Sequence, residues 1–161
     1  MRFGNLALGE FAAALGERSP APASGAATAV TGALAAALAE LTARFAENEA
    51  CCSDAVRLRE RLLDLADEDA AAYSELMETR SAEARERTID VPLEIAERAA
   101  EVAQLAEHLA TSARGSVAGD AQVAVLIARG AVAAAARLVE LNLGGTDDGR
   151  MERARELMKK A

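Results

Sequence analysis

Two long segments of small apolar residues constrain the fold of this chain. Residues 25–41 carry no charge before Glu40, and residues 117–141 are again rich in Ala and Val. Ala and Leu are strong helix formers, whereas the aromatic residues that strands favour are scarce, with no Trp, one Tyr and three Phe. Small side chains also let helices pack at the short end of about 8–10 Å between axes. The sequence therefore predicts an all-α fold, an antiparallel bundle of five to six helices.

The hydrophobic pattern places these helices in one domain, residues 1–161. Two prolines, Pro20 and Pro22, exclude a helix between the first and second predicted helices. Gly144-Gly145 ends the fifth predicted helix. The predicted helices are a short one ending near Gly16, a buried one over 26–47, a third capped by Ser53, a fourth starting near Asp90 with Pro92 in its first turn, a fifth over 117–141, and a last one capped by Asp147 or Asp148.

Charge and cysteine content exclude several classes of partner. The net charge is −8 and no run of Lys or Arg stands out, so we expect no nucleic-acid partner. Residues 25–41 are too weakly hydrophobic for a convincing membrane span, and the first residues lack the apolar core of a signal peptide. Cys51 and Cys52 are adjacent, which favours free thiols in a reducing compartment and gives no metal site. We expect a cytoplasmic protein without a membrane or metal partner.

The two Ala-rich helices are apolar on more than one face. A single chain leaves part of such a surface uncovered, and a second copy could cover it. A homodimer is the expectation from sequence.

Asp69 is the residue most out of place in the pattern. On a helical period it falls on the same stripe as Leu62, Leu65 and Leu76. A carboxylate on a buried face needs a partner or a raised pKa, which is also how a general acid or base is made. Tyr73, one turn further on, could bond to it. The alternative is a structural Asp satisfied by a hydrogen bond between helices, and the residue pattern leaves both open.

An ordered set of short motifs resembles the formiminotetrahydrofolate cyclodeaminase and methenyltetrahydrofolate cyclohydrolase family. The run PAPASGAAT over 20–28 is similar to the family's Pro-x-Pro-Gly-Gly-Gly-Ser opening, and LDLADEDAAAY over 63–73 is similar to its Asp-x-Asp-Ala-x-Ala-Phe/Tyr segment. VPLEIAE over 91–97 matches another helix segment, Asp120 takes the place of a Ser-Asp pair, and Asn142-Leu143 that of an Asn-Leu pair. The pieces occur in order over nearly the whole chain.

The chain also departs from the family pattern. Two of the three family glycines are Ala23 and Ser24, leaving only Gly25, and the family's Ser falls at Ala26. Added Cβ atoms narrow the approach of a ligand to the backbone N–H groups at a helix start. The family's polar turn before Asp120 is replaced by residues 113–116, and the second and third helices are trimmed relative to the family pattern, with fewer residues between them. The resemblance therefore predicts a divergent, trimmed member of the family.

The resemblance implies a folate-dependent enzyme that acts at N5 and N10 of tetrahydrofolate, with a tetrahydrofolate derivative as its small-molecule substrate and no metal. It implies Asp69 as the group that moves protons and Asp120 as the group that orients the pterin or a water molecule. Substrate binding would fall to Asn142, Tyr73 and Arg114 and, at the start of the second helix, to Ser24, Gly25 and Thr28.

Each of these assignments has a structural alternative. Asp120 could be a helix N-cap, Asn142 could help to end its helix, Ser24 or Thr28 could cap the second helix, and Arg114 could be a solvated turn residue. His108 falls on a polar face, where we expect it to be exposed. Two alternative functions also stay open: a repurposed member that binds a reduced folate or related heterocycle for one-carbon transfer or condensation, and a non-catalytic helical dimer.

Overall fold

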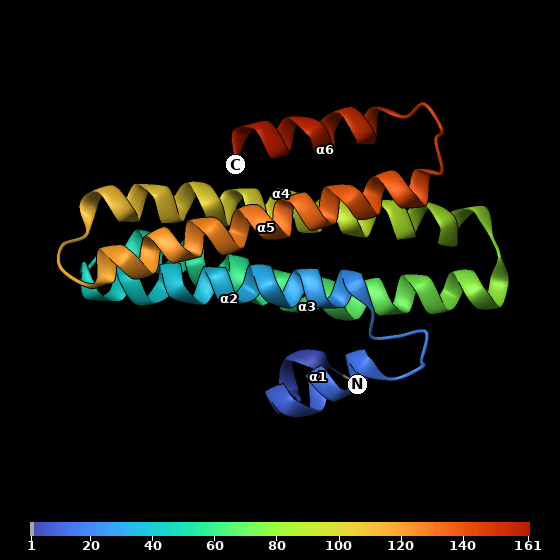
Figure 1. Ribbon diagram of the computed structural model, residues 1–161, viewed down its shortest axis with the longest axis horizontal. Coiled ribbons are helices and arrows are strands. Elements are labelled where there is room, and N and C mark those ends of the chain that lie inside the picture. Colours follow the sequence, from blue (N-terminus) through green and yellow to red (C-terminus); the bar gives the residue numbers. More distant parts are fainter. Residues whose placement is uncertain (1) are drawn as a thin grey trace.

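Four long helices run back and forth along one axis and make up most of the molecule (Figure 1). The computed structural model describes residues 2–161, so Met1, the first residue of the predicted domain, lies outside the described residues. Every regular element in the described part is helical. The elements are η1 (Phe3–Asn5), α1 (Leu8–Gly16), α2 (Ser24–Phe45), α3 (Glu49–Thr79), α4 (Ala82–Ser112), α5 (Val117–Leu143) and α6 (Gly149–Lys160). The predicted all-α antiparallel bundle is confirmed.

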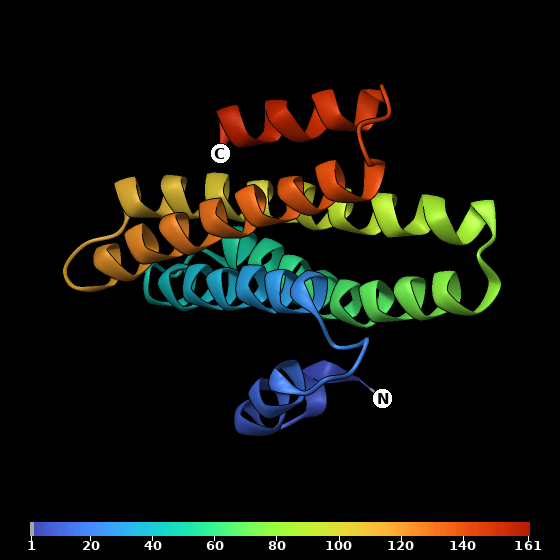
Figure 2. The same cartoon turned by 45° about the vertical axis from the view of Figure 1, so that its right-hand side comes forward.

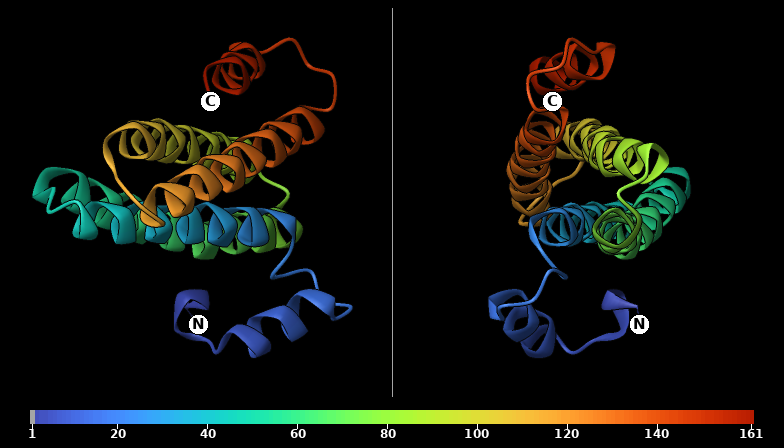
Figure 3. Two further views of the ribbon diagram at one scale, coloured as in Figure 1. Left: turned by 60° about the vertical axis from the view of Figure 1, so that its left-hand side comes forward. Right: turned by 90° about the vertical axis from the view of Figure 1, so that its right-hand side faces the viewer.

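The long helices pack in a ring, with α2 beside α3 and α5, and with α4 beside the same two helices. Viewed end on, α1 and α6 lie on opposite sides of this bundle (Figure 3). Figure 2 shows that the loop after α1 reaches the bundle where α2 begins. The start of α2 and the end of α5 lie at the same end of the bundle, because adjacent helices alternate in direction.

The core combines large side chains on one pair of helices with small ones on the other. Leu58, Leu62, Leu65, Ile95 and Leu109 of α3 and α4 are fully buried, whereas α2 and α5 bury mainly alanines. Each buried Leu or Ile contributes roughly 1.5–3 kcal/mol relative to exposure. The small residues of α2 and α5 leave room for these larger side chains, so the Ala-rich composition reflects close packing.

Two helix starts differ from the prediction. The third helix begins at Glu49, because the side chain of Asn48 accepts a hydrogen bond from the Cys51 N–H and caps it; Ser53 lies inside the helix. The fourth begins at Ala82, where Ser81 caps it through the Ala84 N–H, and not near Asp90. Pro92 therefore sits in the interior of α4. A proline at the first turn is the commoner arrangement, which is why the sequence pattern misplaced this boundary.

By length and composition alone, the helices α2 and α5 are long and apolar enough to cross a membrane. In each of them a large part of the apolar window, 56% in α2 and 44% in α5, is buried within the bundle. Core helices of a bundle have the same composition. On their outer sides these helices keep large apolar side chains exposed, among them Leu34, Leu41 and Phe45 on α2 and Val123 and Leu126 on α5.

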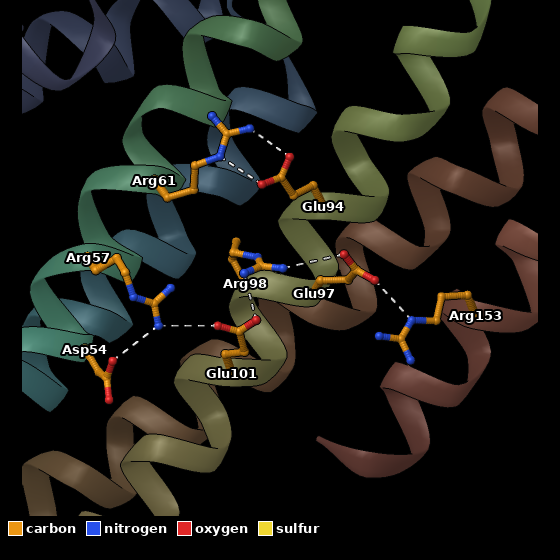
Figure 4. A network of polar contacts seen from close by, with 8 residues as sticks. All are labelled: Asp54, Arg57, Arg61, Glu94, Glu97, Arg98, Glu101 and Arg153. Carbon is orange, nitrogen blue, oxygen red and sulfur yellow. Dashed lines mark hydrogen bonds and ion pairs between the residues drawn. The ribbon is translucent and has the colours of Figure 1, made fainter. Parts of the chain in front are cut away.

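Ion pairs join the outer surfaces of α3, α4 and α6 (Figure 4). Arg61 of α3 bonds to Glu94 of α4, with Nη2 2.7 Å from Oε2. Glu97 of α4 pairs with Arg153 of α6 at 3.1 Å. Such pairs on an exposed surface add little stability singly.

Candidate active site

A cavity of about 310 Å³ lies at the end of the bundle where α2 begins and α5 ends. Its volume is at the lower end of the range for small-molecule sites. All four long helices and the loop before α2 contribute residues to this cavity. The lining residues are Ser19, Pro20, Ala21 and Ala23 of the loop, Ser24 and Gly25 of α2, Asp69, Ala70 and Tyr73 of α3, Thr88 and Pro92 of α4, and Leu138 and Asn142 of α5.

Asp69 caps α2 from the neighbouring helix. The N-cap residue of α2 is Ala23, which has no side chain able to cap, and the carboxylate of Asp69 accepts a hydrogen bond from the backbone N–H of Ala26. That N–H belongs to the third residue of the helix, the position that a side-chain cap normally satisfies. The sequence pattern left a structural and a chemical role open for Asp69, and the contact with the Ala26 N–H is compatible with both.

Burial raises the pKa of Asp69 to about 6, against the lowering effect of the Ala26 N–H. Desolvation disfavours the charged carboxylate, and no Lys, Arg or His lines the cavity to offset that cost. A carboxyl group with a pKa near 6 can both take up and release a proton near neutral pH. Among the residues that line the cavity, Asp69 alone has these properties.

The absence of a side chain at Gly25 leaves room for the Asp69 carboxylate. A Cβ atom built on Gly25 would overlap with the Asp69 carboxylate, at both oxygens and at Cγ. The residues in the places of the other two family glycines, Ala23 and Ser24, are exposed at the rim. The one glycine that this chain keeps is thus the one with no room for a side chain.

The neighbouring predicted site residues divide into those that reach the cavity and those that do not. Ser24 and Tyr73 line it, although no hydrogen bond joins Tyr73 to Asp69 among the described residues, and the tyrosine is 43% exposed. Thr28 is buried and does not line the cavity; its hydroxyl donates to the carbonyl of Ser24 within α2. Neither Ser24 nor Thr28 caps α2.

Asn142 reaches across to α4. Its Nδ2 donates to the main-chain carbonyl of Thr88, with the nitrogen and the oxygen 2.6 Å apart. The residue that ends α5 is Gly144, in the left-handed conformation with φ 61°. Asn142 therefore links two helices at the cavity and does not act as a helix terminator.

Asp120 and Arg114 lie at the other end of the bundle. Asp120 is in the first turn of α5, and the 22-residue separation from Asn142 corresponds to about 33 Å along the helix. It is not the N-cap, a position that Ser116 occupies. Arg114 lies in the turn between α4 and α5. Within one chain, neither residue can contact a ligand held at Asp69.

The sequence pattern missed several residues of the cavity, among them Thr88, Pro92 and Leu138. The one signal that could have identified Thr88 is its position four residues before a proline, where a helix carbonyl loses its partner. His108 is exposed, as predicted. In the described part of the chain, Cys51 and Cys52 form no disulfide, and no cluster of three metal-ligating side chains occurs.

Comparisons with known proteins agree with this architecture. Residues 7–160 match the family model described as formiminotransferase-cyclodeaminase. The fold is similar to the crystal structure of formiminotetrahydrofolate cyclodeaminase from Thermotoga maritima, with a TM-score of 0.87 and 26% identity over 98% of this chain and 88% of that one. A comparison with curated proteins gives no significant match. Since the family model spans nearly the whole sequence, the chain belongs to the formiminotransferase-cyclodeaminase family.

Proposed function

We propose that this protein is a folate-dependent enzyme that acts on the one-carbon unit at N5 and N10 of tetrahydrofolate, with Asp69 as its proton-transfer group. The observation that carries the proposal is the carboxyl group of Asp69, with a pKa raised to about 6, in a cavity at the start of α2. The family and the structural neighbour support a folate substrate. Ser24, Tyr73 and Asn142, which line the same cavity, would hold the substrate.

In a cyclodeaminase reaction, N10 of the folate attacks the carbon of the protonated formimino group bound to N5, whose nitrogen becomes an amino group. The carboxylate of Asp69 would take the proton that N10 loses as the new carbon–nitrogen bond forms. The same proton would then pass to the amino group of the tetrahedral intermediate, which leaves as ammonia and gives the 5,10-methenyl product. One group that both accepts and returns a proton suffices, and a pKa near 6 suits both steps.

The cyclohydrolase reaction starts from that methenyl compound and needs the same group. Asp69 would take a proton from water as the oxygen bonds to the methenyl carbon. The proton would then reach N5 as the bond between carbon and N5 breaks, which leaves a formyl group on N10 and releases one proton. The cavity gives no preference between the two reactions, and cyclodeaminase activity is the first to test because of the neighbour's activity.

One spectroscopic assay separates the two reactions. The 5,10-methenyl compound absorbs in the near ultraviolet, so cyclodeaminase activity on 5-formiminotetrahydrofolate raises the absorbance and cyclohydrolase activity lowers it, each against the spontaneous rate. We expect Asp69→Asn to lower the rate by about 10²–10⁴-fold, the range for loss of a general acid or base. Asp54→Asn, which removes an exposed carboxylate of the same helix, is the matched control. Turnover that survives Asp69→Asn would contradict the mechanism.

The alternatives give different results in the same assay. A repurposed family member would bind a reduced folate and leave both substrates unchanged, and a non-catalytic scaffold would do neither. The retained Gly25, which leaves room for the Asp69 carboxylate, favours a working site over an abandoned one.

We also propose that the protein is a cytoplasmic homodimer. On α2, Leu34, Leu41 and Phe45 recur at seven and four residues, which places them on one stripe, and each is at least 38% exposed. Neither α1 nor α6 covers the outer side of α2 and α5 (Figure 3). A second copy that packs here would bury these side chains. A mass equal to one chain at high concentration in analytical ultracentrifugation would overturn the dimer.

A further inference from the structure

Pro92 leaves a main-chain carbonyl of α4 without its helical partner. In an α-helix the carbonyl of each residue accepts the N–H of the residue four positions later. Pro92 lies in the interior of α4, and it has no N–H to offer to the carbonyl of Thr88. The proline ring also crowds that carbonyl and pushes it off the helical direction. Thr88 and Pro92 both line the cavity, so the residue whose carbonyl has no helical partner lies at the candidate site.

The side chain of Asn142, on α5, donates a hydrogen bond to this carbonyl. Its Nδ2 lies 2.6 Å from the oxygen of Thr88, 54 positions away in the sequence. A carbonyl oxygen can only accept, so the amide must turn its nitrogen toward Thr88. The Oδ1 atom and one N–H of Asn142 are then left for another partner, in a residue that also lines the cavity.

We infer that Pro92 is a positioning residue for the substrate, because it frees the Thr88 carbonyl to hold Asn142 with Oδ1 as an acceptor for an N–H group of the ligand. The choice of ligand rests on the proposed function. A reduced pterin carries N–H donors on its pyrimidine ring, remote from N5 and N10. An acceptor on the α4–α5 wall would bind that edge while N5 and N10 face Asp69 on the α3 wall.

An amino acid with its own N–H at position 92 would remove this arrangement. That N–H would bond to the Thr88 carbonyl within the helix, and the amide of Asn142 would lose its fixed orientation. The competing explanation is that the ring of Pro92, which is fully buried, only fills space. Two variants separate the explanations. Pro92→Ala and Pro92→Val both restore the N–H, but Val fills the space of the buried ring, whereas Ala leaves part of it empty.

The first test is a double-mutant cycle on folate affinity, measured by calorimetry with 5-formyltetrahydrofolate as the probe. We expect Pro92→Ala, Pro92→Val and Asn142→Ala each to raise the Kd by about tenfold, the effect of one hydrogen bond. Because Pro92 acts through Asn142, the double variant Pro92→Ala/Asn142→Ala should also show about tenfold. Effects that multiply to about a hundredfold, or a Pro92→Val variant that binds like the wild type, would overturn the inference.

The second test needs no ligand, so it decides whether Pro92 holds Asn142 even if the wild type binds no folate and the proposed function fails. The side-chain amide of Asn142 gives its own signals in a ¹H–¹⁵N NMR spectrum, assigned by their loss in Asn142→Ala. We expect those signals to shift in both Pro92→Ala and Pro92→Val, as the bond to Thr88 is lost. Signals that stay in place in either variant would show that Pro92 does not hold Asn142.

Discussion

Gly25 and Asp69, 44 positions apart in the sequence, lie in close contact at the start of α2, where a Cβ atom added to the glycine would overlap with the carboxylate. We therefore predict that Gly25→Ala displaces the carboxylate from the Ala26 N–H, lowers turnover at least a hundredfold, and lowers the free energy of unfolding by about 1–3 kcal/mol, the cost of overpacking a filled site. Kinetics and thermal melting check this prediction.

A neighbouring position supplies the control for Gly25. Ala23→Gly brings back a glycine of the family pattern at an exposed rim position. The side chain of Ala23 does not cap α2 and has no polar group, so we expect this variant to fold and to keep turnover within about threefold of the wild type. If Gly25→Ala were as active as Ala23→Gly, the carboxylate would not depend on Gly25.

The pKa of Asp69 predicts how stability depends on pH. Since burial raises the pKa from 3.8 to about 6, the folded protein binds more protons than the unfolded chain between these values. The wild type should then lose stability as pH rises from about 4 to 6, by at most about 3 kcal/mol, and stay level above that. Asp69→Asn keeps an acceptor for the Ala26 N–H without the charge.

Asp69→Asn should therefore match the wild type near pH 4 and melt several degrees higher at pH 8. Circular dichroism melts over this range measure the difference, with Asp54→Asn as the control for the loss of one exposed negative charge. A variant that melts lower than the wild type at pH 8 would mean that the capping bond to Ala26 outweighs the cost of the buried charge.

Asp120 provides a test of where the site lies. It is about 30 Å from the cavity along α5. If the cavity of one chain is the whole site, Asp120→Asn should keep kcat and KM within about twofold, as a substitution remote from the chemistry does. A large loss of kcat in a variant that still folds would instead mean that a second copy brings its Asp120 to the cavity.

The sequence predicted those features that depend on local chemistry. The end of α5 follows from Gly144 and Gly145, both at positive φ, and the cap of α6 follows from Asp148. Asp69 was found because a carboxylate interrupts an apolar stripe. All three signals lie within a few residues of the feature they mark.

Features that depend on tertiary contacts were missed. The sequence placed Pro92 at a helix start, since nothing local shows that Asn142 of another helix satisfies the carbonyl that the proline leaves free. The lack of room for a side chain at Gly25, next to Asp69, is likewise visible only once α2 and α3 are packed. Asp120 was grouped with Asp69 by resemblance, and sequence order does not show that they lie at opposite ends of the bundle.

Arg150, at the start of the last helix α6, meets three carboxylates. Arg150 pairs with Asp148 at 2.7 Å and with Glu86 and Asp90 of α4 at 2.7 and 2.8 Å, and its side chain is 21% exposed. We predict that Arg150→Ala loosens α6 and lowers Tm by roughly 2–4 °C, as expected for loss of a partly buried network in a chain of this size.

Arg153→Ala is the matched control for Arg150→Ala, because Arg153 pairs with Glu97 while 47% exposed, so its loss should lower Tm by less.

The effect of Arg150→Ala should depend on pH in a defined direction. The hydrogen bond from Arg150 lowers the pKa of Asp148 to about 2, so this stabilisation is complete above about pH 4 and is lost as pH falls toward 2. The Tm difference between wild type and Arg150→Ala should shrink over that range. Hydrogen exchange should show faster exchange in α6 alone; faster exchange throughout α4 and α5 would mean that Arg150 supports the whole bundle and does more than hold its last helix.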